Sequence, residues 1–158
     1  MSRVRIPDLI GTSARLGLAG VWLVSGLLKA VDPDQTYVAV RAYDVLPDAG
    51  VEVVAALLPW VELALGVLLL VGIGTRLVAA LSAALLVVFI AGVAQAWARG
   101  LSIDCGCFGG GGAVEPGETT YVQELVRDAG FLLMAGWLVV RPRTALALDE
   151  RLGTGRIG

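Results

Sequence analysis

The chain has 158 residues, of which 57% are hydrophobic and only 16% are charged, and its mean hydropathy is +0.81. A soluble domain of this size needs a polar surface that this composition cannot supply, so the sequence predicts a membrane protein. The net charge of −2 and the lack of a basic block argue against nucleic-acid binding. Because histidine is absent, this chain alone cannot supply a histidine-ligated haem, a histidine zinc site or a histidine general base.

Four apolar segments are expected to cross the membrane as helices. A spanning helix needs about 20 mostly apolar residues. The segments that approach or meet this requirement are residues 14–31, 51–72, 77–98 and 121–140. The sequence therefore predicts an all-α fold, a four-helix transmembrane bundle, in which residues 1–158 form a single integral membrane domain.

The first and fourth segments need a further argument because charged residues interrupt them. The first is short unless Arg15 and Lys29, near its ends, extend their long side chains to the membrane surface. Arginines before an apolar stretch are also typical of a cleaved signal peptide, but no convincing small-x-small cleavage site follows, so we expect a retained helix. The fourth carries Glu124, Arg127 and Asp128 in its first half, so its prediction depends on the apolar run that follows them.

The distribution of arginine predicts how the bundle is oriented. Cytoplasmic connections carry an excess of basic residues. The first tail, the tight second connection and the last tail hold most of the arginines, namely Arg3, Arg5, Arg15, Arg76, Arg141, Arg143, Arg151 and Arg156. The other two connections hold only Arg41 and Arg99. We therefore expect a multi-pass protein of the inner (plasma) membrane, with both termini in the cytoplasm and the loop 99–118 on the outer side, where a disulfide can persist.

Both cysteines lie in the stretch "IDCGCFGGGG", residues 103–112, within that loop. Glycine between Cys105 and Cys107 removes the side-chain clash that would resist the bend needed to join their sulfurs. A disulfide that closes so small a loop is a poor structural staple, and a strained, exposed disulfide is easily reduced. The pair therefore indicates redox exchange. An inert structural pair and metal binding by two thiolates together with a partner stay open as alternatives, and no metal site is expected from this chain alone.

Charged residues inside the predicted spans form a second candidate set. An ionisable group at membrane depth is a functional candidate and needs a partner. Glu62 lies near the middle of the second segment, just after Trp60, and Lys29, Arg127 and Asp128 lie in the outer halves of the first and fourth. In an up-down bundle these groups could converge below the cysteine loop, where the cations would favour a reactive thiolate and Glu62 could hold one of them. A purely structural role is the alternative for each.

Four stretches resemble the motifs of the MauE/DoxX-like redox-associated membrane proteins. They are "SGLLKAVDP" at 25–33, "LPWVELALG" at 58–66, "ARGLSIDCGCFG" at 98–109 and "LVRDAGFLL" at 125–133. The family is known as four-helix membrane proteins that are often paired with thioredoxin-like partners, and its namesake acts in maturing a disulfide-rich periplasmic subunit of methylamine dehydrogenase. The resemblance implies that Cys105 and Cys107 are a redox pair. It also places four residues on other motif positions without establishing their roles: Lys29, Glu62, Arg127 and Asp128.

These observations predict a membrane thiol–disulfide oxidoreductase. Cys105 and Cys107 would exchange electrons with an extracytoplasmic thioredoxin-like partner, in either direction. No tightly bound cofactor is expected, and the simplest second redox partner is a quinone in the bilayer, near Trp60 and the outer half of the bundle. A different class of function is a non-catalytic assembly or docking subunit for the maturation of an extracytoplasmic protein, and a weaker alternative is a small-molecule carrier with Glu62 in its site.

Overall fold

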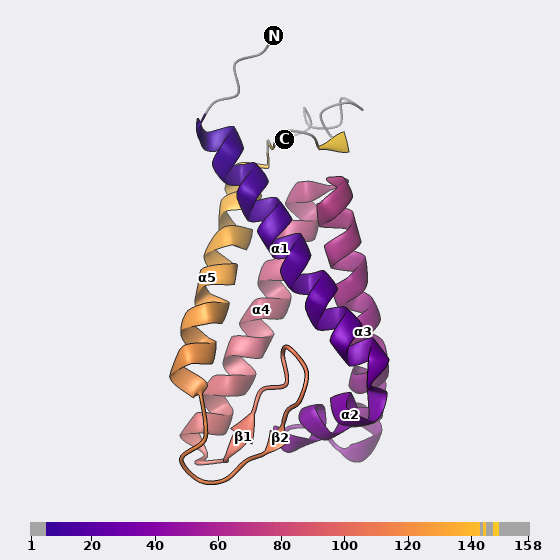
Figure 1. The fold of residues 1–158 in the computed structure, drawn as a ribbon, viewed down its shortest axis with the longest axis vertical. Helices are drawn as coiled ribbons and strands as arrows, with labels where there is room; N and C mark the ends of the chain where they lie inside the picture. The colour runs from indigo at the N-terminus through magenta and orange to yellow at the C-terminus, as the bar shows by residue number, and fades with distance from the viewer. Residues whose placement is uncertain (1–5, 143, 145–146, 149–158) are drawn as a thin grey trace.

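The computed structural model describes residues 6–142, 144 and 147–148, and these residues form an all-α bundle with one short hairpin (Figure 1). Five helices lie within this part of the chain. Their bounds and those of the two strands are, in chain order, α1 Ile6–Val31, α2 Pro33–Ala42, α3 Asp48–Val71, α4 Thr75–Ala98, β1 Ile103–Asp104, β2 Gly112–Ala113 and α5 Tyr121–Val140. The predicted all-α class is confirmed, and each of the four predicted segments lies largely within one helix: α1, α3, α4 or α5.

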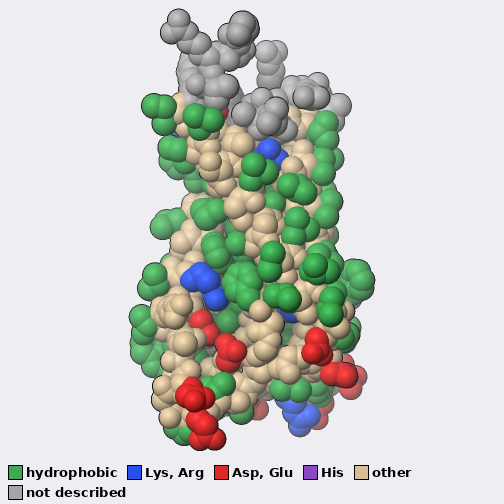
Figure 2. Space-filling view, in the orientation of Figure 1, with side chains coloured by type: hydrophobic (Ala, Val, Ile, Leu, Met, Phe, Trp, Pro, Cys, Tyr) green, Lys and Arg blue, Asp and Glu red, His purple; other side chains and the backbone are tan. Residues whose placement is uncertain are grey.

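Three of these helices are long and apolar enough to cross a membrane, namely α1, α3 and α4. Large apolar side chains cover their outward faces, as Leu57 on α3 and Val88 on α4 illustrate, and hydrophobic side chains extend along most of the molecule in Figure 2. Such a surface is stable against lipid and not against water. The chain is therefore a multi-pass membrane protein. Helix α5 packs in the same bundle, but it differs from the other three in composition because its first half carries charged residues.

The long helices form two pairs that close into one bundle. Helix α1 packs mainly against α3, and α4 packs mainly against α5, while α1–α5 and α3–α4 contacts join the pairs. The first pair approaches closely because Gly26 has no side chain. A Cβ atom there would lie 2.9 Å from the carbonyl oxygen of Pro59 and 2.9 Å from Leu63 Cγ. Between the pairs, the indole Nε1 of Trp22 donates a hydrogen bond to Ser82 Oγ at 3.0 Å.

The structure corrects the expectation that Arg15 and Lys29 reach the membrane surface. Both are buried, with 2% and 7% of their surface exposed. Arg15 donates hydrogen bonds to the carbonyl oxygens of Leu69 and Leu70 at 2.7 and 3.0 Å, which lie in the last turn of α3. A helix end leaves these carbonyls without intrahelical partners, so a buried cation is stable there. Helix α1 consequently begins eight residues before the predicted start at Ala14, at Ile6.

Two elements at one end of the bundle were not expected from the sequence. Helix α2 follows α1 directly, with Asp32 as its N-cap: the Asp32 side chain accepts a hydrogen bond from the backbone N–H of Gln35. The hairpin β1–β2 lies beside α2, with Ile103 opposite Ala113 and Asp104 opposite Gly112. Helix α1 starts and α5 ends at the opposite end of the bundle (Figure 1). Several arginines used for the predicted orientation lie outside the described residues, namely Arg3, Arg5, Arg143, Arg151 and Arg156.

Candidate functional site

The cysteines lie in the turn between β1 and β2, which reaches back toward the helices (Figure 1). Two glycines of this turn have positive φ angles and no space for a side chain. Gly106, between the cysteines, has φ +66°, and a Cβ atom there would lie 2.8 Å from Ala39 Cβ and 2.9 Å from the Gly110 carbonyl oxygen. Gly111 has φ +98°, and its Cβ would lie 2.7 Å from both Ala39 Cβ and Gly106 Cα. Only glycine fits these positions, because the turn folds on itself and against α2.

Three backbone carbonyls of the turn are held by side chains of the helices. The Tyr43 hydroxyl donates to the Cys105 carbonyl oxygen at 3.2 Å. Gln35 Nε2, on α2, donates to the Gly111 carbonyl oxygen at 2.6 Å. The carbonyl oxygen of Cys107 lies 3.0 Å from Lys29 Nζ and 2.6 Å from Ser25 Oγ, both on α1. The turn is therefore positioned by its backbone, which leaves the two cysteine side chains available for chemistry.

Lys29 belongs to a buried network with Glu62 and Ser25. Its Nζ lies 3.1 Å from both carboxylate oxygens of Glu62 and 2.6 Å from Ser25 Oγ, and Glu62 is fully buried. The ammonium has three protons, which match three partners: the Glu62 carboxylate, Ser25 Oγ and the Cys107 carbonyl oxygen. Ser25 Oγ lies within bonding distance of Glu62 Oε2, at 3.0 Å, and of the Cys107 carbonyl oxygen, but its single proton serves one of them at a time. The loop carbonyl thus completes the hydrogen bonding of a buried ion pair.

The two sulfurs lie next to each other as free thiols. The Sγ atoms of Cys105 and Cys107 are 2.7 Å apart, compared with about 2.05 Å in a disulfide. The hydrogen bond to Cys107 Sγ lowers the pKa of Cys105 against the opposing effect of burial, and the Cys107 backbone N–H, at 3.3 Å, and Arg127 act in the same direction. The same sulfur–sulfur hydrogen bond, together with burial, raises the pKa of Cys107. Of the two thiols, Cys105 is therefore the one whose ionisation is favoured.

Arg127 is the cation that contacts the pair. Its Nη2 lies 3.7 Å from Cys105 Sγ, and its Nε donates to Asp128 Oδ1 at 3.0 Å. The guanidinium also lies over the ring of Phe108, with its Cζ 4.9 Å from the ring centroid. These contacts on two sides orient the guanidinium toward the sulfur, where its charge favours the thiolate.

The structure brings most of the predicted site residues together, but in two separate groups. Lys29 and Glu62 meet at the Cys107 backbone, whereas Arg127 and Asp128 lie at the Cys105 side chain. Lys29 therefore does not contact a sulfur, and Glu62 holds Lys29 rather than Arg127. Trp60 is 65% exposed on the outer surface of α3 and lies apart from this cluster.

Four residues of the site were missed by sequence reasoning, namely Ser25, Gln35, Tyr43 and Glu124. Ser25 lies one turn before Lys29 on the same helix face, a spacing that could have revealed it. Glu124 lies one turn before Asp128 and is likewise an acid inside a predicted span, so the same argument applies to it. Gln35 and Tyr43 had no local signal, because their contacts depend on how the turn folds against α2.

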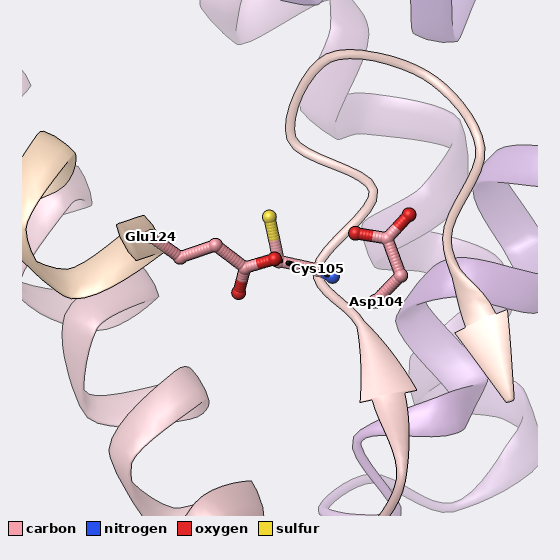
Figure 3. A group of neighbouring side chains, drawn as sticks. All are labelled: Asp104, Cys105 and Glu124. Carbon is pink, nitrogen blue, oxygen red and sulfur yellow. Dashed lines mark hydrogen bonds between the residues drawn. The ribbon is translucent and has the colours of Figure 1, made fainter. Parts of the chain in front are cut away.

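Glu124 and Asp104 approach Cys105 from opposite sides (Figure 3). One carboxylate oxygen of each acid and Cys105 Sγ all lie within 4.8 Å of one another. A metal ion bound there would meet the Arg127 guanidinium, which already lies 3.7 Å from the sulfur. Because like charges repel strongly at partly buried positions, this group suits an acid–thiol pair better than a divalent cation, and we assign no metal ligands among the described residues.

The fold and this site define a multi-pass membrane protein that holds a pair of thiols in a braced loop at one end of its helices. The family model "Methylamine utilisation protein MauE" matches residues 7–141, so the chain belongs to the MauE family. It is similar to the "Methylamine utilization protein MauE" of Paracoccus denitrificans, with 38% identity over 112 residues. The match covers 70% of this chain and 60% of that relative. No solved structure matches the chain significantly.

Replacing Arg127 should change the reactivity of Cys105. In a Cys107→Ser background, Arg127→Met removes the guanidinium 3.7 Å from Cys105 Sγ. We expect the pKa of Cys105 to rise, because a charge-assisted hydrogen bond to the thiolate is lost. The alkylation rate of the reduced protein near neutral pH should then fall by up to about tenfold. Arg99→Met is the matched control, since Arg99 pairs with exposed Asp44. An unchanged rate–pH curve for Arg127→Met would assign this arginine a structural role.

The Lys29–Glu62 pair should behave as one unit in stability measurements. Lys29→Met leaves a fully buried carboxylate without its cation, and Glu62→Leu leaves a buried ammonium, so each should cost about 3–5 kcal/mol. The double variant leaves no buried charge and should cost clearly less than the sum of the two. Denaturant unfolding in detergent micelles measures all three. The exposed Arg99–Asp44 pair, treated in the same way, should contribute less than about 1 kcal/mol, and additive losses at Lys29 and Glu62 would contradict the assignment.

Proposed function

We propose that this protein is a membrane thiol–disulfide redox protein whose Cys105–Cys107 pair exchanges electrons with an extracytoplasmic thioredoxin-like partner. The observation that carries the proposal is the pair of free thiols with sulfurs 2.7 Å apart, one of which lies 3.7 Å from the Arg127 guanidinium. Membership of the MauE family supports it. The relative from P. denitrificans is named for methylamine utilization, and the same chemistry would serve the maturation of a disulfide-containing protein in such a system.

The two cysteines are suited to different steps of the exchange. Cys107 is partly exposed, whereas Cys105 is 9% exposed and bound to Arg127. When the pair is a disulfide, a thiolate of the partner attacks Cys107 Sγ, the Cys105–Cys107 bond breaks, and Cys105 leaves as a thiolate. The second partner thiol then attacks the partner sulfur of the mixed disulfide and releases Cys107, which takes up the proton that this thiol loses. The partner has then lost two electrons and this protein has gained them. A leaving thiol with a low pKa departs faster, which suits Cys105.

The membrane placement follows from where the charged side chains point. We propose that α5 is the fourth span, because Glu124 and Asp128 face the bundle interior while Val126, Leu133 and Val140 are exposed on its outer side. The hairpin end, where acidic side chains gather in Figure 2, would face the outside of the inner membrane, with both termini in the cytoplasm.

A quinone is the proposed second redox partner. A cavity of about 340 Å³ lies between the end of α1, α2 and the cysteine turn, lined by Leu27, Leu28, Lys29, Gln35, Gly106 and Gly110 among others. Exposed Leu27 and Leu28 give it an apolar border, which suits a lipid-soluble ring. Oxidation of the dithiol by a quinone would form the disulfide and transfer two electrons and two protons to give the quinol. Trp60 is exposed on α3, so its proposed contact with quinone would come from the lipid side.

The second candidate function is a non-catalytic assembly or docking subunit. The observation in its favour is the bracing of the turn by Lys29, Gln35 and Tyr43, which would equally shape a rigid docking loop. In that case the thiols would pair once and then stay oxidised.

Single cysteine variants should distinguish these functions by trapping a partner. Cys105→Ser leaves partly exposed Cys107 to attack a partner disulfide, and the mixed disulfide cannot be resolved by a neighbouring thiol. We expect it to accumulate several-fold more adduct than Cys107→Ser on non-reducing gels of membranes from the native host. The variant without either cysteine should give none. A larger yield from Cys107→Ser would make Cys105 the attacking residue, and no adduct from either variant would favour the docking subunit.

The orientation of the loop should be visible in intact cells. A thiol reagent that cannot cross membranes should label Cys107 of the reduced protein without lysis, because the positive-inside distribution places the hairpin outside. A cysteine introduced in the α3–α4 connection by Ile73→Cys, at an exposed position and in a background without native cysteines, is the matched control and should react only after lysis. The reverse pattern would place the hairpin in the cytoplasm and exclude an extracytoplasmic partner.

A further inference from the structure

Glu124 lies directly beside Cys105 and has no role in the exchange described so far. It belongs to the first turn of α5 and is 3% exposed. Its Oε1 accepts a hydrogen bond from Thr120 Oγ1 at 3.0 Å and lies 3.5 Å from the Cys105 backbone nitrogen (Figure 3). Its Oε2 is buried and has no hydrogen-bond partner among the described residues. A buried carboxylate oxygen without a donor is costly when charged, but the same oxygen can carry a proton.

The charges around Cys105 explain why a proton is needed there. The titratable and charged groups that face this pair come from the hairpin, the α2 end and α5, and they are Asp104, Cys107, Tyr43, Arg127 and Asp128. Arg127 is the cation among them, and it is already paired with Asp128 at 3.0 Å. A Cys105 thiolate and an ionised Glu124, with Sγ and a carboxylate oxygen within 4.8 Å, would be two further negative charges in a mostly buried site. Two negative charges this close repel each other in a mostly buried site, and a proton on one of the two groups would relieve that repulsion.

We propose that Glu124 is the proton acceptor and donor of the dithiol: it takes up a proton when Cys105 becomes a thiolate and gives it back when the thiolate is discharged. The inference rests on the proposed thiol–disulfide exchange and assigns a proton-transfer residue within it. A separation within 4.8 Å allows transfer directly after a small side-chain rotation or through one water molecule.

We take Glu124 to be a carboxylate in the oxidised protein, in which Cys105 is neutral in the disulfide. Attack of a partner thiolate on Cys107 breaks the disulfide and places a negative charge on Cys105, and the proton that the partner thiol released is taken up by Glu124. In the reverse direction the Cys105 thiolate attacks the mixed disulfide, and Glu124 returns its proton to the departing partner thiolate. The buried site therefore gains one electron pair without gaining two uncompensated charges.

Infrared difference spectroscopy tests this proposal on the full-length protein in lipid nanodiscs. Reduced-minus-oxidised spectra, recorded near neutral pH with a small dithiol as reductant, should show the carbonyl stretch of a protonated carboxyl group that appears on reduction. Glu124→Gln should remove this band, and Glu124→Asp should keep it at a shifted frequency. Glu118→Gln is the matched control, since Glu118 is exposed in the same connection, and should leave the band unchanged. A merely structural glutamate would not produce a band that follows the redox state.

The outcomes separate this inference from the proposed function. If the wild-type pair cycles between dithiol and disulfide but the band is absent, or persists in Glu124→Gln, the assignment of Glu124 is overturned while thiol–disulfide exchange stands. If the wild-type pair cannot be reduced and reoxidised by small thiols and disulfides, the proposed exchange fails, and the role of Glu124 fails with it. If Glu124→Gln fails to fold, Glu124→Asp still tests the assignment of the band, because a band at an unshifted frequency would exclude Glu124 as its source.

Discussion

The buried ion pair between Lys29 and Glu62 is the interaction on which the rest of the site depends. Two charges removed from solvent are stable only when their geometry is good and their remaining protons and lone pairs find partners. Here Ser25 and the carbonyl oxygen of Cys107 supply those partners. The loop and the bundle therefore stabilise each other. Without the loop the Lys29 ammonium lacks its third hydrogen-bond acceptor, and without the ammonium the loop loses a hydrogen bond that anchors it.

In this arrangement, the side chains that hold the backbone of the loop are different from those that contact the Cys105 sulfur. The side chains of α1 and α2 bind carbonyl oxygens of the turn, which carry no redox function. Two side chains of α5 lie close to the Cys105 sulfur instead: Arg127, with Nη2 at 3.7 Å, and Glu124, with a carboxylate oxygen within 4.8 Å. Because the backbone is held by α1 and α2 and the sulfur is contacted from α5, a change of charge at the sulfur need not move the turn.

The membrane environment explains why so few charges occur and why they lie inside. Lipid cannot solvate an ammonium or a carboxylate, so each charged side chain at this depth must turn inward to a partner. Arg15 meets the carbonyl end of α3, and Lys29 meets Glu62. The outward faces remain apolar, and α5 combines both requirements, with its acids inside and its valines and leucine outside.

The sequence by itself determined the helices, because apolar runs of spanning length are a one-dimensional property and each of the four predicted segments lies largely within one helix: α1, α3, α4 or α5. The sequence also identified Cys105 and Cys107 as a candidate pair, because only one residue separates them. It identified four charged residues that need partners inside the bundle, namely Lys29, Glu62, Arg127 and Asp128. Only the tertiary structure decided which partners they have. Lys29 and Glu62 are 33 residues apart in the sequence, and Arg127 and Cys105 are 22 apart. Which of the two cations, Lys29 or Arg127, lies at the sulfur therefore depends on how the turn packs. Glu124 shows the same limit. The sequence places it near the start of a predicted helix, but only the packing of α5 against the hairpin brings its unpartnered oxygen close to Cys105.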